Sequence, residues 1–318
     1  MLPTGISLAS RLSATATGAA TLITTEGTVT GTTASGVARF GNIPYAQPPE
    51  RWKPPELPEP YPGGRLDGTE FGPACVQPDY GSAGSEDCLQ LNVFAPTSAI
   101  ARPDAALPVL LWIHGGAYQS GSASGFDVTP LVSFLDGKAV AVTINYRLGV
   151  FGFLGSSQLR PDASASTGNY GLLDQRAAFA WVQRNAPSFG GDPSSVMIFG
   201  ESAGAGSVSC HLALAGSSPF FQRAALESGS FAPWVARPLE HAEGIFSQVM
   251  PTVPEGPLLL GYGPWSIFSQ LSQLSPLLSR YSSTSTTFAL TAFVTSARCW
   301  TRRAAPTWRA SARARPPT

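Results

Sequence analysis

The sequence predicts an α/β fold in which helices cover both faces of a doubly wound, mostly parallel sheet. Residues 107–113 and 138–144 are continuous apolar runs with the length of strands that are buried on both faces. Residues 172–186 have helical spacing of apolar side chains, and a short apolar strand and another helix follow them. Strands that alternate with helices in this way are typical of a doubly wound sheet.

The remaining elements can be assigned from turn residues and periodicity. We expect short strands with glycine turns over residues 20–41, a proline-dense loop over 44–64, strands over 89–95, 195–200 and 223–227, and a helix over 203–215. On the helix over 172–186, the apolar spacing predicts one shared face made of Leu173, Ala177, Ala180, Trp181 and Arg184.

Composition narrows the class of protein. The chain has 318 residues, of which 43% are hydrophobic and 13% charged, and its formal net charge is zero. It is long enough for a sizeable core, and it does not resemble a disordered or nucleic-acid-binding chain. The longest apolar runs are far too short for a membrane span, and residues 1–21 contain no clear signal peptide.

The charge pattern changes abruptly near residue 256. Residues 1–255 hold all 20 acidic residues, whereas residues 256–318 hold seven arginines and no Asp, Glu, Lys, Asn or His. One interpretation is a basic tail that meets an anionic partner. The other is translation in the wrong reading frame, which is favoured because every residue type changes at once. We therefore expect an ordered part over 1–250 and an anomalous tail over 251–318 that is frameshifted or disordered.

The sequence Gly200-Glu201-Ser202-Ala203-Gly204 matches the pattern G-x-S-x-G. The pattern is informative here because it follows a predicted strand and opens a predicted helix, as a nucleophile elbow requires. Small residues around the serine allow a tight, strained turn that leaves its hydroxyl clear of the sheet. The N–H groups at the start of the helix then point toward developing negative charge.

A second small-residue segment, His114-Gly115-Gly116-Ala117-Tyr118, directly follows the predicted strand over 107–113. Backbone N–H groups in such a loop can approach a ligand closely and suit an oxyanion hole, completed by the N–H of Ala203. The alternative is a plain glycine turn.

Seven segments carry a resemblance to a known family: FGNIPYAQPP (40–49), SEDCLQLNVFAP (85–96), LWIHGGAYQSG (111–121), INYRLGVFGFL (144–154), GNYGLLDQRAAFAWVQRN (168–185), FGGDPSSVMIFGESAGAGSV (189–208) and ESGSFAPW (227–234). Together they resemble the type-B carboxylesterase/lipase family, which includes cholinesterases and fungal lipases. The resemblance implies an α/β-hydrolase fold, truncated before its C-terminal strands, with residues 1–250 as the N-terminal part of the domain.

The resemblance also implies a serine hydrolase that cleaves carboxylic esters through an acyl-serine intermediate. Ser202 would be the nucleophile, and Gly116, Ala117 and Ala203 would supply the oxyanion hole. Trp234 resembles a wall of the acyl pocket, although core packing explains it equally well. No cofactor and no metal are implied, and the expected partner is a small-molecule or lipid ester, not a nucleic acid.

Four cysteines, Cys75, Cys88, Cys210 and Cys299, show no metal-ligand spacing. Cys75 and Cys88 lie in a loop rich in Gly, Pro and Ser, where a disulfide is sterically easy, although two free thiols remain an alternative. The pair also resembles the first disulfide of the family. A disulfide would favour a secreted protein, but the lack of a clear signal peptide leaves localisation undecided.

The resemblance further implies two ion pairs, Arg147 with Asp174 and Arg51 with Glu86. None of the three histidines suits the catalytic base: we expect His114 to pack beside the oxyanion loop, His211 to lie too far along its helix, and His241 to be solvated. Glu201 and Glu227 are expected to be buried structural or electrostatic groups.

In α/β-hydrolases the triad acid and histidine follow the serine in the chain. Residues 251–318 contain no histidine and only Glu255 as an acid. We therefore expect the chain as written to be a poor enzyme. The alternatives are a non-catalytic cholinesterase-like binding or adhesion protein and an inactive truncated gene product.

Overall fold

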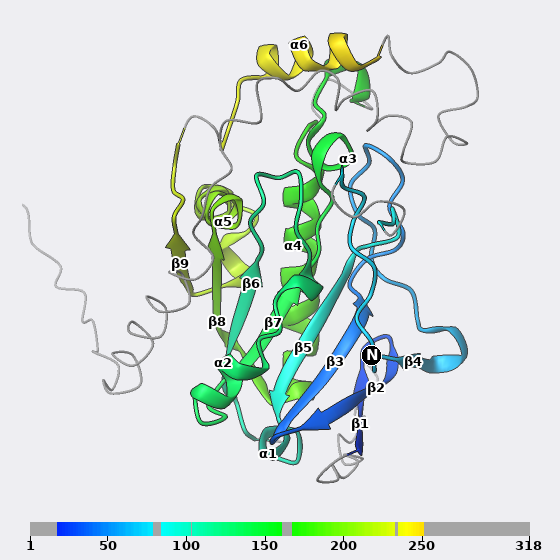
Figure 1. The fold of residues 1–318 in the computed structure, drawn as a ribbon, viewed down its shortest axis with the longest axis vertical. Coiled ribbons are helices and arrows are strands. Elements are labelled where there is room, and N and C mark those ends of the chain that lie inside the picture. The colour runs from blue at the N-terminus through cyan, green and yellow to red at the C-terminus, as the bar shows by residue number, and fades with distance from the viewer. Residues whose placement is uncertain (1–17, 79–83, 103, 161–166, 233–234, 251–318) are drawn as a thin grey trace, which may run out of the picture. The chain divides into compact units, whose positions relative to one another are not determined.

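The computed structural model describes residues 18–78, 84–102, 104–160, 167–232 and 235–250 (Figure 1). The anomalous tail over 251–318, Trp234 and Cys299 lie outside the described residues. The strands are β1 Gly18–Thr24, β2 Gly27–Ala34, β3 Val37–Pro44, β4 Arg65–Asp67, β5 Gln90–Pro96, β6 Leu107–Ile113, β7 Val140–Ile144, β8 Gly191–Glu201 and β9 Arg223–Glu227. The α-helices are α1 Thr97–Ile100, α2 Thr129–Phe134, α3 Gly149–Phe153, α4 Tyr170–Asn185, α5 Ala203–Ala213 and α6 Leu239–Val249.

Across the described residues, the strands form one mixed sheet in the order β1-β2-β3-β5-β7-β6-β8-β9, with β4 beside β2. The first part is antiparallel, through the pairs β1–β2, β2–β3, β3–β5 and β5–β7. The second part, β7-β6-β8-β9, is parallel throughout. The chain leaves β6 toward β7 on one side and returns to β8 on the other side.

Helices cover both faces of this sheet, which confirms the predicted doubly wound arrangement. In Figure 1, α2 lies in front of the sheet and α4 behind it. Neighbouring residues of one strand enter different apolar clusters: Val93 belongs to the large core that includes Phe179 of α4, whereas Phe94 packs in a smaller core with Val132 of α2. This alternation is the consequence of successive side chains pointing to opposite faces of a strand.

Most predicted elements appear close to their expected bounds. The strands at 107–113 and 223–227 match residue for residue, and β5 and β7 differ from their predicted ranges by one or two residues. Strand β8 begins four residues earlier than expected, at Gly191, because its first residue pairs with Leu107 of β6.

The face that Leu173, Ala177, Ala180, Trp181 and Arg184 share is not the most buried face of α4, although Trp181 lies in the core and Ala177 packs against it. Leu173, Ala177 and Ala180 are only half-buried and Arg184 is exposed. The face that is buried includes the polar side chains of Asp174, Gln175 and Asn185 together with Gly171, Ala178, Phe179 and Val182. The spacing of apolar residues could not identify this buried face, because three of its side chains are polar. Their burial is tolerated because they form hydrogen bonds with partners elsewhere in the chain.

In the described part of the chain, no helix is both long enough and apolar enough to cross a bilayer. The same residues contain no group of three or more His, Cys, Asp or Glu side chains arranged to hold a metal ion.

Candidate active site

The candidate site lies where β6 and β8 end side by side. β6 is followed directly by His114 and β8 by Ser202, and the two strands are parallel neighbours. β6 also pairs with β7 on its other side, so the chain changes winding direction at this point. In open α/β sheets, ligands bind outside the carboxyl ends of the strands at such a switch point.

Ser202 occupies a strained turn between β8 and α5. Its backbone has φ 54° and ψ −117°, outside the regions that non-glycine residues usually adopt. The Ser202 N–H donates to the Glu227 carbonyl at 2.9 Å, and the Ser202 carbonyl accepts from the Gly206 N–H at 2.9 Å. One bond ties the turn to β9 and the other begins the helix, so the surrounding structure holds the strained conformation in place.

Helix α5 starts in close contact with the end of β6, and this contact leaves no room for a side chain at Gly204. A β-carbon on Gly204 would lie 2.0 Å from the Ile113 carbonyl oxygen. That distance is far inside van der Waals contact, so the glycine of the G-x-S-x-G pattern is a steric requirement of this packing.

The loop over 114–121, which we call the glycine loop, has an unusual backbone. Gly116, Ala117 and Tyr118 have φ values of 104°, 55° and 59°, so three consecutive residues are left-handed. The Gly116 carbonyl accepts from the N–H groups of Gln119 and Ser120 at 2.9 and 3.0 Å, and the Tyr118 carbonyl accepts from Gly149 N–H at 2.7 Å. These bonds satisfy the Gly116 and Tyr118 carbonyl oxygens within the protein.

The structure brings the glycine loop against the serine. A β-carbon on Gly115 would lie 3.2 Å from the Ser202 β-carbon and 2.9 Å from Glu201 Oε2. Gly116 and Ala117, singled out from the sequence, follow Gly115 directly, and Ala203 follows Ser202 as the first residue of α5. Segments that are some 80 residues apart in the sequence therefore form one small site.

His114 packs beneath the glycine loop, as expected. Its side chain is only 1% exposed, its ring stacks on Tyr146 at 4.4 Å, and its Nδ1 lies 2.8 Å from the Gly115 carbonyl. The Tyr146 hydroxyl donates to the His114 carbonyl at 2.8 Å. Burial lowers the pKa of His114 to about 4, so the ring is neutral at physiological pH and Nδ1 carries the proton that it donates to Gly115.

His211 is buried within a polar chain that the sequence did not reveal. His211 Nε2 lies 2.9 Å from Gln175 Oε1, His211 Nδ1 lies 2.9 Å from the Ser217 hydroxyl, and Gln175 Nε2 donates to the Ser207 hydroxyl at 3.0 Å. Since an amide oxygen can only accept, Nε2 of His211 carries the proton and Nδ1 accepts from Ser217. Burial lowers the pKa of His211 to about 3, with the nearby Arg176 charge acting in the same direction.

Tyr118 anchors the glycine loop through an aromatic contact. Its ring packs against Phe153 of α3, with the ring centroids 4.8 Å apart. Burial raises the pKa of Tyr118, which keeps the hydroxyl protonated.

Two carboxyl groups stand beside the serine at the ends of neighbouring strands. Glu201 and Glu227 are register partners in β8 and β9. Both are half-buried, so the expectation that they are buried was too strong. Desolvation raises the pKa of each, and for Glu227 the nearby Glu201 charge raises it further. His241 is exposed on α6, as expected.

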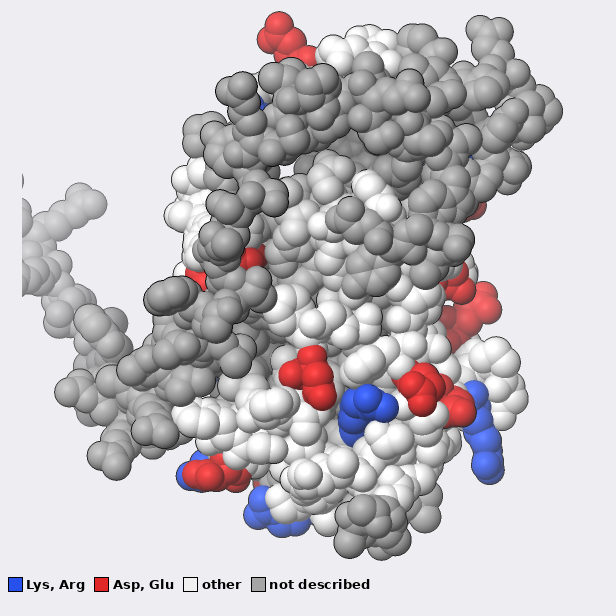
Figure 2. All heavy atoms as spheres, in the orientation of Figure 1, with Lys and Arg blue, Asp and Glu red and all other residues white. Residues whose placement is uncertain are grey.

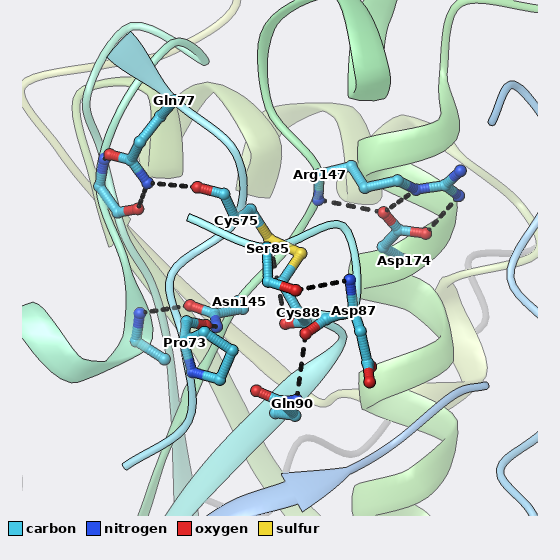
Figure 3. Close-up of a disulfide and its surroundings, with 12 residues drawn as sticks. Pro73, Cys75, Gln77, Ser85, Asp87, Cys88, Gln90, Asn145, Arg147 and Asp174 are labelled. Carbon is cyan, nitrogen blue, oxygen red and sulfur yellow. Dashed lines mark hydrogen bonds and ion pairs between the residues drawn. A yellow bond between two sulfur atoms is a disulfide. The ribbon is translucent and has the colours of Figure 1, made fainter. Parts of the chain in front are cut away.

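The Cys75–Cys88 disulfide is confirmed, with Cα atoms 5.0 Å apart. Figure 3 shows it beside the side chain of Gln77, which reaches from the disulfide-closed loop to the glycine loop. Cys210 is a free, half-buried thiol whose pKa is raised by burial.

Both ion pairs are also present. Arg147 Nε and Nη2 donate to the two Asp174 oxygens at 2.8 and 2.7 Å, and both side chains are almost fully buried (Figure 3). Arg51 Nε donates to Glu86 at 2.8 Å in a more exposed pair.

The face of the molecule in Figure 2 carries few charged side chains among its described residues. Acidic and basic groups are interspersed there, and the described part of this face shows no gathered basic patch.

Comparison with known proteins gives one consistent result. The sequence model described as "Carboxylesterase family" matches residues 19–250. The para-nitrobenzyl esterase of Bacillus subtilis (strain 168) is 42% identical over 243 residues, which cover 72% of this chain and 48% of that protein. The acylcarnitine hydrolase of Mus musculus is 44% identical over 215 residues, covering 62% of this chain and 36% of that protein.

Solved structures agree with the sequence comparison. A Geobacillus stearothermophilus carboxylesterase at pH 6.2 matches with a TM-score of 0.73 and 39% identity, covering 80% of this chain and 53% of that one. A PNB esterase matches with a TM-score of 0.70 and 40% identity, covering 81% of this chain and 54% of that one. The neighbours have the α/β-hydrolase fold, which confirms the predicted fold class, and the chain spans about half the length of these relatives or less.

Proposed function

The chain belongs to the carboxylesterase family, and from this premise we propose that it carries the nucleophile and the oxyanion hole of a serine ester hydrolase. The observation that carries the proposal is the strained turn at Ser202 with the glycine loop packed against it. A non-glycine residue held at φ 54° costs folding free energy, and such strain is concentrated at functional sites.

In the proposed reaction, Ser202 Oγ attacks the ester carbonyl carbon while its proton passes to a base. The new C–O bond pushes the carbonyl electron pair onto oxygen. The N–H groups of Gly116, Ala117 and Ala203 would stabilise that oxyanion, and each such donor is typically worth about 10²–10³ in kcat. The alcohol then leaves with a proton, and water hydrolyses the acyl-serine in the reverse sequence of proton transfers.

We expect neither of the two buried histidines to be the base. His114 donates its Nδ1 proton to Gly115, and His211 is held between Gln175 and Ser217. The depressed pKa of each opposes uptake of the serine proton. Losing the base in a comparable serine enzyme costs about 10⁶ in kcat, so we expect the chain as written to turn over esters very slowly.

The substrate class we propose is a carboxylic ester of a small molecule or lipid. It rests on the relatives, whose names include a para-nitrobenzyl esterase and a fumonisin B1 esterase. Trp234 is proposed as a wall of the acyl pocket on resemblance alone.

The expected lack of a base makes a direct test possible. A para-nitrophenyl ester has a leaving group that departs as the anion, and Ser202 can release its hydroxyl proton slowly to hydroxide or buffer at pH 8. Deacylation has no such activated leaving group and needs a base to activate water. Acyl-Ser202 should therefore accumulate on prolonged incubation at pH 8. Intact-mass spectrometry and peptide mapping should find one acyl group on Ser202, and the Ser202→Ala variant should carry none. Equal acylation of both proteins, or none of either, would refute the proposal.

A further inference from the structure

Gln77 joins the disulfide-closed loop to the end of the glycine loop. Its side chain is only 1% exposed. Gln77 Oε1 accepts from the Gly121 N–H at 2.7 Å, and Gln77 Nε2 donates to the Gly121 carbonyl at 2.8 Å and to the Cys75 carbonyl at 3.0 Å. Every one of these bonds is to backbone, so the carboxamide fixes the position of Gly121 relative to Cys75 (Figure 3).

A second buried carboxamide joins the same two segments. Asn145, which follows β7, accepts from the Ala123 N–H at 2.7 Å and donates to the Pro73 carbonyl at 2.9 Å. The Asn145 backbone carbonyl in turn accepts from the Tyr45 hydroxyl at 2.7 Å. Two bridges therefore hold this part of the chain: Gln77 binds Gly121, the last residue of the glycine loop, and Asn145 binds Ala123 just after it.

The position of Gly121 determines the position of the start of the loop. Gly121 has φ 111°, and a β-carbon there would lie 2.4 Å from His114 Nδ1 and 2.7 Å from the Gly115 carbonyl. The end of the glycine loop thus packs directly on its beginning, where His114 Nδ1 meets that same Gly115 carbonyl. A displaced Gly121 would remove the support of His114 and Gly115, the residues immediately before Gly116 and Ala117.

We propose that Gln77 is a positioning residue for the oxyanion hole, which it anchors to the loop closed by the Cys75–Cys88 disulfide. The inference rests on the proposed function, since the hole is part of it. Gln77 touches no reacting atom. It acts through Gly121 and His114 on the direction of the Gly116 and Ala117 N–H groups.

A purely structural role makes a different prediction. If Gln77 only stabilised the fold, its loss would lower stability without a specific effect on an anionic adduct at Ser202. Gln183 provides the matched control: its Nε2 likewise donates to two backbone carbonyls, those of Pro193 and Phe220, at 2.8 and 2.9 Å, and it lies outside the site. Methionine keeps the length of glutamine but removes its hydrogen bonds, so Gln77→Met and Gln183→Met form a comparable pair.

The probe is phenylboronic acid, which needs no turnover. The Ser202 oxygen adds to boron, the hydroxyl proton is released to buffer, and the tetrahedral boronate anion places an oxygen in the hole. Dissociation constants can be measured for the full-length chain by ¹¹B NMR at pH 8. We expect Gln77→Met to weaken binding at least ten-fold, Gln183→Met to change it less than two-fold, and Ser202→Ala to abolish it.

Hydrogen exchange at Gly121 tests the anchor without any ligand. Gln77→Met should accelerate exchange of the Gly121 amide at least ten-fold. Gln77→Glu retains an acceptor for that amide while losing both donor bonds, so it should keep Gly121 protected and still weaken boronate binding. Gln183→Met should leave Gly121 exchange unchanged.

The outcomes separate the two proposals. Serine-dependent boronate binding that is equally tight in the Gln77 variants would overturn the positioning role and leave the proposed function intact. Binding by the unaltered protein that does not depend on Ser202 would refute the proposed function and this inference together.

Discussion

Arg147 and Asp174 form a two-pronged ion pair between the end of β7 and the first turns of α4, with Asp174 completely buried. The Asp174 carboxylate also accepts from the Arg147 backbone N–H at 3.1 Å, and Arg147 Nη1 donates to the Glu50 carbonyl at 3.2 Å. Burial nevertheless raises the pKa of Asp174, because desolvation outweighs the attraction of the arginine. The pair therefore specifies how the two elements meet more than it stabilises the fold.

That balance predicts a non-additive double-mutant cycle. Asp174→Asn or Arg147→Met alone should each lower the free energy of unfolding by about 3–5 kcal/mol, since each leaves a buried group without its partner. The double variant Arg147→Met/Asp174→Asn should lose clearly less than the sum of the two single losses. Urea unfolding measures all four proteins, and additive losses would contradict the argument.

The more exposed pair supplies the control for that cycle. Arg51 and Glu86 have side chains 15% and 31% exposed. Glu86→Gln should therefore cost no more than about 1 kcal/mol in the same urea experiment.

Removing the disulfide should destabilise the protein measurably. Cys75 and Cys88 are 13 positions apart, and closing a loop of this size is worth about 3 kcal/mol in the chain-entropy account. We expect the Cys75→Ser/Cys88→Ser variant to lose about that much free energy of unfolding, and unaltered protein to lose a similar amount under reducing conditions. Cys210→Ser should have little effect on the disulfide, and a loss below about 1 kcal/mol in the double variant would count against the prediction.

The two buried histidines predict how stability depends on pH. In the unfolded chain an imidazole takes up a proton near pH 6.5, whereas His211 and His114 resist protonation until about pH 3 and 4. The unfolded state thus binds more protons below pH 6.5. Keeping the two histidines neutral in the folded state therefore has no cost above pH 6.5. Below pH 6.5 the free energy of unfolding falls, by up to about 1.4 kcal/mol per pH unit for each histidine.

A variant isolates the contribution of His211 from that of the carboxyl groups. The raised pKa values of Asp174, Glu201 and Glu227 act in the opposite direction, so the difference between proteins is more informative than one curve. Between pH 6.5 and 4.5, the free energy of unfolding of His211→Asn should fall less steeply than that of the unaltered protein. His241→Asn, at an exposed position, should reproduce the unaltered slope.

Alanine substitutions at two glycines, Gly204 beside the Ser202 turn and Gly244 in α6, should change stability in opposite directions. Gly204→Ala should lower the free energy of unfolding by about 1–3 kcal/mol or more, because its β-carbon would overlap the Ile113 carbonyl. Gly244→Ala, in α6 with open space around it, should raise the free energy by up to about 1 kcal/mol through better helix propensity. Thermal or urea unfolding of the two variants measures both changes. A Gly204→Ala variant whose free energy of unfolding is unchanged would disprove the close packing of α5 on β6.

The sequence by itself determined the local features of this protein. The apolar runs at 107–113 and 138–144 had the length and composition of buried strands, and β6 and β7 form there. The small residues of the G-x-S-x-G pattern and of the glycine loop indicated tight turns of the backbone, because few other residues fit such turns. Such features depend on neighbours within a few positions, which a pattern can represent.

Only the tertiary structure decided which polar groups are buried and what they bind. The buried face of α4 depends on Asp174 and Gln175, which apolar spacing treats as surface residues. Gln77 meets Gly121 across 44 positions and Gln175 meets His211 across 36, and no signal in a single sequence distinguishes these glutamines from exposed ones. A buried carboxamide is stable only where another segment presents its backbone or a side chain at hydrogen-bonding distance. Folding of the whole sheet brings these partner segments together. The sequence could therefore indicate Ser202 and the glycine loop, but not the side chains that hold them together.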